Sequence, residues 1–229
     1  MSPAPQLCHV FVFIERGAPE AARLEAAGLR ESVRRRHVGQ GTANVCYCFD
    51  NAFLELVWAE DEAELTGPTV ARTRLAERAR WRETGASPFG IALRTAPDQP
   101  LPFPTWDYRP PYLPAGMAIP VALASEDPRQ PMVFRSPGSA RPDGWTDGRA
   151  GDRQRPAGLA EIIGIELDLP THVPPGEALR RLAEAGLLTL GTSDTGQSRM
   201  VLSLSRVDGG PPRRLALPEL RWLDPVTPR

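Results

Sequence analysis

The chain has 229 residues, of which 41% are hydrophobic, enough for one large domain or two small ones with a sizeable core. Its net charge of -1 and pI near 6.3 argue against a general binder of nucleic acids or anionic membranes, which attract clustered positive charge. All 27 basic residues are arginine, which excludes a lysine Schiff base or a phosphate-loop lysine. Together with abundant Ala, Pro and Gly, the absence of lysine is typical of a GC-rich bacterial genome.

The cysteines Cys8, Cys46 and Cys48 form an odd set without the spacing of a disulfide framework. Cys46 and Cys48 lie two apart in a predicted strand, where the geometry of a mutual disulfide is strained. No signal peptide is visible, and no segment approaches 18 consecutive apolar residues. We therefore expect a cytoplasmic protein that does not insert into membranes.

The first part of the chain predicts a βαβββ unit. A proline begins its helix, and Gly28, a helix-ending residue type, follows it. Asp50-Asn51 suits the tight turn of a hairpin. The predicted elements are strands at 7–14, 29–38, 44–49 and 53–59, a helix at 19–27, and a connecting helix at 70–83.

The rest of the chain predicts two further regions. The middle one has short strands at 89–95, 118–124 and 132–136, separated by proline-dense surface loops, and then an exposed excursion at 136–155. The last one has strands at 161–169, 187–192, 200–206 and 215–223 and a helix at 176–185. The predicted units are a first module with its connecting helix (1–86), a degenerate middle module (87–156) and a C-terminal βαβββ-like module (157–229), all parts of one larger unit.

Two polar residues interrupt apolar strands. Glu55 lies in a strand that is apolar on both faces, and an unpartnered buried charge costs several kcal/mol. His9 interrupts the first strand in a similar way. Glu55 could pair with Arg34 or Arg36 in a buried ion pair, and His9 could be a hydrogen-bonded core residue. Alternatively, both residues face a functional cavity.

Strand parity predicts which residues share a face of the hairpin. With a two-residue turn at 50–51, residues whose numbers sum to 101 lie opposite each other, which pairs Cys46 with Glu55. The face with Glu55 suits a cavity, and the opposite face is strongly apolar and suits packing. The expected cavity face comprises Asn44, Cys46, Cys48, Phe53, Glu55 and Val57, and the opposite one Val45, Tyr47, Phe49, Leu54, Leu56 and Trp58.

Five segments accompany the βαβββ order, at 16–20 (RGAPE), 37–44 (HVGQGTAN), 54–62 (LELVWAEDE), 88–91 (PFGI) and 102–112 (PFPTWDYRPPY). Together they resemble the glyoxalase-like domain family of the vicinal oxygen chelate superfamily, which includes glyoxalase I, extradiol dioxygenases and bleomycin-resistance proteins. The resemblance covers about residues 7–135 well and the remainder loosely. It implies an α+β fold of repeated βαβββ units, whose curved mixed sheets surround a concave cavity.

The resemblance also implies a ligand set. His9 and Glu55 stand where that superfamily places metal ligands, and His37 could be a third; Glu55 and His37 are then the catalytic candidates. The second half departs from the pattern, with Gly90 at the histidine position and Phe134 at the glutamate position. The divalent metal would be Zn, Ni, Fe or Mn, and no nucleotide cofactor is expected. The expected ligand-cavity residues are Gln40, Asn44, Cys46, Trp106 and Tyr108.

Besides an ancestral fold whose filled cavity serves mainly assembly, two functions with a ligand stay open from the sequence. One is a metal-assisted lyase, isomerase or dioxygenase, in which the cation polarises a small substrate. The other is a metal-free protein of the bleomycin-resistance type that binds or sequesters a small molecule. Either would act as a monomer or homodimer with a small-molecule ligand and without nucleic acid. Arg34, Arg35 and Arg36 predict an exposed edge strand, with recognition of an anionic ligand as the alternative.

Overall fold

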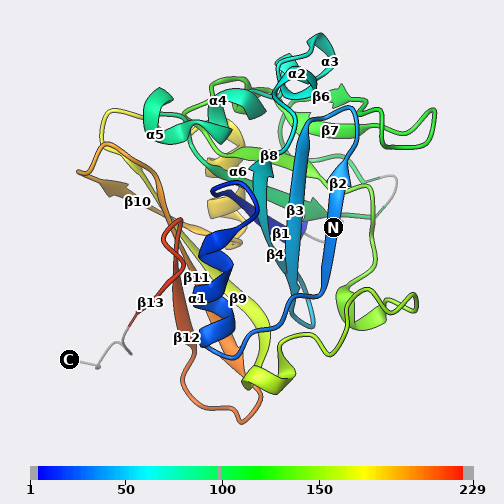
Figure 1. The fold of residues 1–229 in the computed structure, drawn as a ribbon. Helices are drawn as coiled ribbons and strands as arrows, with labels where there is room; N and C mark the ends of the chain where they lie inside the picture. Colours follow the sequence, from blue (N-terminus) through cyan, green and yellow to red (C-terminus); the bar gives the residue numbers. More distant parts are fainter. Residues whose placement is uncertain (1–4, 97–98, 224–229) are drawn as a thin grey trace.

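The computed structural model describes residues 5–96 and 99–223, which form two curved mixed sheets with few helices (Figure 1). One sheet has eight strands in the order β2-β3-β4-β1-β5-β8-β7-β6, and the other has five in the order β10-β9-β11-β12-β13. This arrangement confirms the expected α+β fold. Within the described residues, no helix combines the length and apolar character needed to cross a bilayer.

The first module has the predicted βαβββ order. A 3-10 turn at Pro19–Ala21 precedes α1, and Gly28 follows the helix with a φ of 88°. The hairpin register pairs Cys46 with Glu55, as strand parity predicts. The elements are β1 (Gln6–Phe13), α1 (Ala22–Ala26), β2 (Val33–His37), β3 (Thr42–Cys48) and β4 (Phe53–Ala59).

The prediction of a single helix at 70–83 is wrong. The chain instead makes four short helices, α2 (Glu62–Leu65), α3 (Pro68–Ala71), α4 (Leu75–Ala79) and α5 (Trp81–Thr84). Arg74 has a left-handed backbone with a φ of 59°, and the Thr73 hydroxyl donates to the carbonyl of Val70. A left-handed residue cannot continue an α-helix, so the helical path breaks between α3 and α4.

Residues 89–135 repeat the strand order of the first module. Its strands are β5 (Phe89–Arg94), β6 (Thr105–Tyr108), β7 (Ile119–Ala122) and β8 (Met132–Arg135). β5 pairs parallel with β8 as β1 does with β4, and β1 and β5 join the two modules antiparallel at the centre of the sheet. The sequence predicts no strand at β6, because prolines border it on both sides. No helix separates β5 from β6 in the described residues, consistent with a degenerate module.

The C-terminal module has the predicted elements but a different strand order. They are β9 (Leu159–Pro170), α6 (Glu177–Glu184), β10 (Thr189–Ser193), β11 (Arg199–Arg206), β12 (Arg213–Leu217) and β13 (Arg221–Leu223). The strand after the helix, β10, pairs directly with β9, whereas β2 lies three strands away from β1. This region is therefore not a third copy of the first module. The last predicted strand is divided into β12 and β13, with a cis peptide bond before Pro218.

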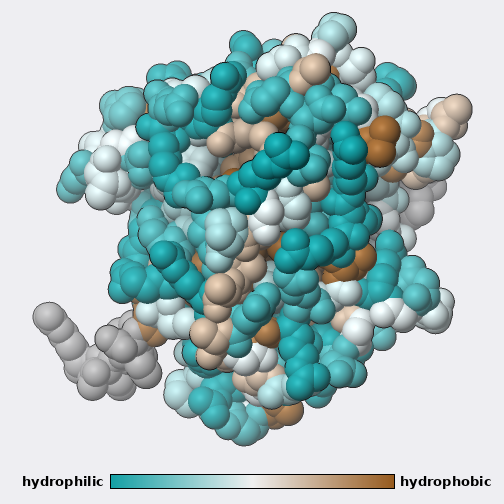
Figure 2. Space-filling view, viewed as in Figure 1, coloured by the Kyte–Doolittle hydropathy of each residue, from teal (hydrophilic) through white to brown (hydrophobic). Residues whose placement is uncertain are grey.

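The main apolar core lies between the two sheets. Val45, Tyr47 and Leu56 project from the hairpin into this core, where they pack with α1 and with β9 and β11 of the five-stranded sheet. The predicted apolar face of the hairpin is therefore confirmed as a packing face. A second apolar cluster lies on the opposite face of the eight-stranded sheet. The outer surface in Figure 2 is mostly hydrophilic, with hydrophobic residues in small separate patches.

Candidate functional site

A cavity of about 670 Å³ lies on the concave face of the eight-stranded sheet. Its wall combines β1, β2 and β4 of the first module with β7 and β8 of the second, so neither module encloses it alone. Residues 136–149, within the predicted exposed excursion, complete the wall on one side. Asp50 holds the end of this segment through ion pairs with Arg153 and Arg155. The excursion is mostly exposed as predicted, but it also helps to form the cavity.

Aromatic rings form the floor of the cavity. The His9 imidazole stacks on Phe53 with a centroid distance of 4.3 Å, and the ring of Phe134 meets it edge-on at 5.5 Å. Phe11 lies beside Phe134, and its ring occupies the space where a side chain at position 90 would project. A Cβ atom on Gly90 would lie 2.0 Å from this ring. Glycine at the expected histidine position thus makes room for an apolar floor.

His9 and Glu55 meet at this floor. Nε2 of His9 lies 3.5 Å from Oε2 of Glu55, and the Asn44 amide donates a hydrogen bond to Oε1 of Glu55. Burial, with a further contribution from the positive charge of Arg35, lowers the pKa of His9 to about 3, so the imidazole is neutral at pH 7. Burial raises the pKa of Glu55, against the hydrogen bond from Asn44 and the charge of Arg35.

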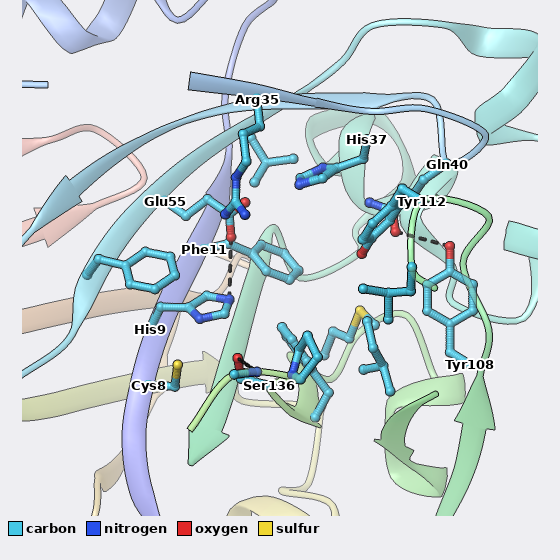
Figure 3. Close-up of a pocket in the computed structure, with 18 of the residues that line it drawn as sticks. Cys8, His9, Phe11, Arg35, His37, Gln40, Glu55, Tyr108, Tyr112 and Ser136 are labelled. Atoms are coloured by element: carbon cyan, nitrogen blue, oxygen red, sulfur yellow. Dashed lines mark hydrogen bonds and ion pairs between the residues drawn. The ribbon is translucent and has the colours of Figure 1, made fainter. Parts of the chain in front are cut away.

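The edge strand β2 supplies two polar side chains to the cavity. Arg35 and His37 point into it from β2, above Phe11 and His9 in the view of Figure 3. Arg34 instead pairs with Glu31, and Arg36 pairs with Asp61, so neither forms the buried ion pair with Glu55 considered from the sequence. The sequence reasoning missed Arg35 as a cavity residue. Its alternation with His37 was the available signal, because residues two apart on a strand share a face.

A chain of hydrogen bonds links His37 to the far end of the cavity. The Tyr108 hydroxyl donates to Oε1 of Gln40 at 3.0 Å, and Nε2 of Gln40 donates to the Thr42 hydroxyl at 2.7 Å. The same hydroxyl oxygen lies 2.9 Å from Nδ1 of His37. Burial lowers the pKa of His37 to about 4, and Tyr112 lies against its ring at 5.0 Å. Gln40 and Tyr108 thus line the cavity, together with Tyr112.

The other three expected cavity residues lie behind its wall. Asn44 connects β2 to the floor, since its Oδ1 accepts from the backbone N–H of Arg35 while its amide donates to Glu55. Cys46 is buried opposite Glu55, and burial raises the pKa of its thiol, which disfavours a nucleophilic thiolate. The Trp106 ring is covered by the guanidinium of Arg72 at 4.4 Å.

The donor set does not fit a tightly held divalent metal. Such a site usually takes three protein ligands, and in the described part of the chain no three His, Cys, Asp or Glu side chains come together. His9 and Glu55 are close, but His37 on β2 does not join them as a third donor. Near the floor, the second module contributes Met132 and Phe134 to the cavity lining, and neither is a hard-metal ligand.

The comparisons with known proteins agree with the fold. Residues 7–99 match a family model described as a glyoxalase-like domain. No curated protein matches the chain in sequence. The matched region spans β1 to β5 and therefore includes His9, Arg35, His37 and Glu55, whereas Tyr108 and Phe134 of the second module lie beyond it.

Proposed function

Because this chain carries a glyoxalase-like domain of the vicinal oxygen chelate superfamily, we propose that it binds a small, largely apolar molecule in the cavity without a metal. The observation that carries the proposal is an aromatic floor beside which the described residues bring no more than two metal-donor side chains together. Ligand pockets of about 300–1,000 Å³ are typically apolar with a few polar groups that orient the ligand. The cavity of about 670 Å³ falls in this range.

The positions of the polar groups support binding of an apolar molecule with a polar end. Rings from β1, β4 and β8 cover one side of the cavity, and Arg35 with His37 covers the other. A flat ring on Phe53 or Phe134 would gain apolar and stacking contacts, which contribute about 0.5–1.5 kcal/mol per ring pair beyond the burial of area. Polar substituents on the same molecule would then face β2.

The test uses the full chain in buffer with a chelator, and 1-naphthamide as a neutral aromatic probe. We expect isothermal titration calorimetry to show one binding site. Leu113 lines the cavity, and the larger side chain in Leu113→Trp would fill part of its volume. This variant should weaken binding by about tenfold, or about 1.4 kcal/mol. Leu123→Trp is the matched control, because Leu123 is exposed and lies outside the cavity.

The metal content of the purified protein tests the other half of the proposal. We expect Mn, Fe, Ni and Zn to be substoichiometric by mass spectrometry. A stoichiometric metal that is lost in the His9→Ala and Glu55→Gln double variant would contradict the proposal and support the metal-assisted alternative. Probe binding that requires added metal would contradict it as well.

A further inference from the structure

We infer that the ligand of this cavity is an aromatic carboxylate, whose carboxylate group binds Arg35 and His37 while its ring lies on the aromatic floor. This inference rests on the proposed function and adds the charge and chemical class of the ligand. Three observations support it: the placement of Arg35 in the cavity wall, the hydrogen bonding of His37, and the position of the aromatic rings.

The first observation is that the cavity wall contains an arginine without an ion pair in the described part of the chain. The wall contains three arginines, Arg35, Arg36 and Arg149, but Glu55 is its only carboxylate among the described residues. Arg36 and Arg149 pair with Asp61 and Asp147, which lie outside the wall. Arg35 forms no ion pair with any residue in the described part of the chain, and its guanidinium lies against the neutral thiol of Cys46. Its charge favours the ionised form of Glu55 without forming an ion pair with it, so its guanidinium donors stay available to an anion.

The second observation concerns the proton of His37. The Thr42 hydroxyl accepts from Gln40, so its own proton can be donated to Nδ1 of His37. The proton of the neutral imidazole then lies on Nε2, which becomes a donor. The Tyr108 hydroxyl orients the Gln40 side chain, and this fixes the direction of donation along the series of hydrogen bonds from Tyr108 to His37. His37 thus presents a donor without requiring a charge.

The third observation is that these two donors face the rings across the cavity. Arg35 and His37 are two residues apart on β2, so they project to the same side of the strand (Figure 3). Phe53 and Phe134 lie at the floor, grouped around His9. A guanidinium binds a carboxylate through two parallel hydrogen bonds, and such charge-assisted bonds are about twice as strong as neutral ones. An aryl ring joined to a carboxylate satisfies both sides of the cavity at once.

The experiment compares 2-naphthoate with 2-naphthamide, which have the same ring and differ in charge. Titrations use the full chain near neutral pH with a chelator present. For the parent, we expect the naphthoate to bind at least about tenfold more tightly than the naphthamide. Arg35→Gln should remove this preference, so that the two probes bind with similar affinity. Arg34→Gln is the matched control, since Arg34 neighbours Arg35 on β2 but pairs with Glu31 outside the cavity.

The outcomes separate the two proposals. Equal binding of both probes to the parent would overturn the aromatic carboxylate while leaving the proposed function intact, and this result needs no variant. A preference that persists in Arg35→Gln would also overturn the assignment of Arg35. Failure of both naphthyl probes to bind the parent would overturn the proposed function and this inference together.

Discussion

Nε2 of His9 lies 3.5 Å from Oε2 of Glu55, although the two residues belong to different strands and are 46 positions apart in the chain (55 − 9). Parallel pairing of β1 with β4 places Phe11, not His9, directly opposite Glu55. The imidazole and the carboxyl group therefore meet diagonally on the cavity face. Both side chains are about nine-tenths buried, with 10% and 8% exposed, so their protonation is coupled to folding.

We expect His9→Gln to reduce the loss of stability at acidic pH. Because the pKa of His9 is lowered from 6.5 to about 3 in the folded protein, the unfolded chain binds this proton first. The stability that neutral His9 contributes is full above pH 6.5 and is lost as the pH falls toward 3. The corresponding slope approaches about 1.4 kcal/mol per pH unit. Urea unfolding of parent and variant between pH 3 and 6.5 measures how the free energy of unfolding depends on pH. Identical slopes for the two proteins would contradict the burial of a neutral His9.

Glu55→Gln should tighten the binding of 2-naphthoate and leave that of 2-naphthamide nearly unchanged. Glu55 is the only carboxylate that the described residues contribute to the wall, and it opposes an anionic ligand whenever it is ionised. We expect a gain of about threefold to tenfold, or about 1 kcal/mol. Glu60→Gln is the control, because Glu60 pairs with Arg16 on the surface. Weaker naphthoate binding in Glu55→Gln would argue that Glu55 donates a proton to the ligand.

Gly90→Ala should shrink the cavity from its floor. The added methyl group would lie 2.0 Å from the Phe11 ring, which has to move toward the cavity. Overpacking of this kind costs about 1–3 kcal/mol of stability. We also expect weaker binding of both naphthyl probes. Gly164→Ala is the control, since a methyl group there has its nearest neighbour at an ordinary 3.4 Å. Unchanged stability and binding in Gly90→Ala would show that Phe11 does not need this space.

Asp50→Asn should loosen the segment that closes one side of the cavity. The Asp50 carboxylate is buried and accepts from both Arg153 and Arg155, so its loss leaves two guanidinium groups without a charged partner. Removal of one partner from a buried pair costs about 3–5 kcal/mol, and less here because both arginines are partly exposed. Limited proteolysis should then cut faster within 137–158. In Asp147→Asn, which removes an exposed ion pair, the cleavage rate should match that of the parent.

The hairpin shows how much a local pattern can determine. Side chains alternate with a period of two along a strand, so the turn at 50–51 was sufficient to predict that Cys46 faces Glu55 and that Val45 and Leu56 pack in the core. The βαβββ order and the helix end at Gly28 followed from equally local signals. These features depend on neighbouring residues, and the sequence contains them directly.

Tertiary structure decided the rest. The sequence showed an arginine triplet at 34–36 but not which of the three faces the cavity. The pairing of β2 with β3 sets the direction of these side chains. Arg34 and Arg36 have acidic partners, whereas Arg35 has no ion pair within the described residues. The position of β10 beside β9, rather than at the far edge of a sheet, also arises from pairing between distant segments. Sequence patterns alone were enough to predict an α+β fold and a polar pair on apolar strands. Which side chains line the cavity depended on long-range contacts, because strand order and loop docking are set by packing energies that no local pattern records.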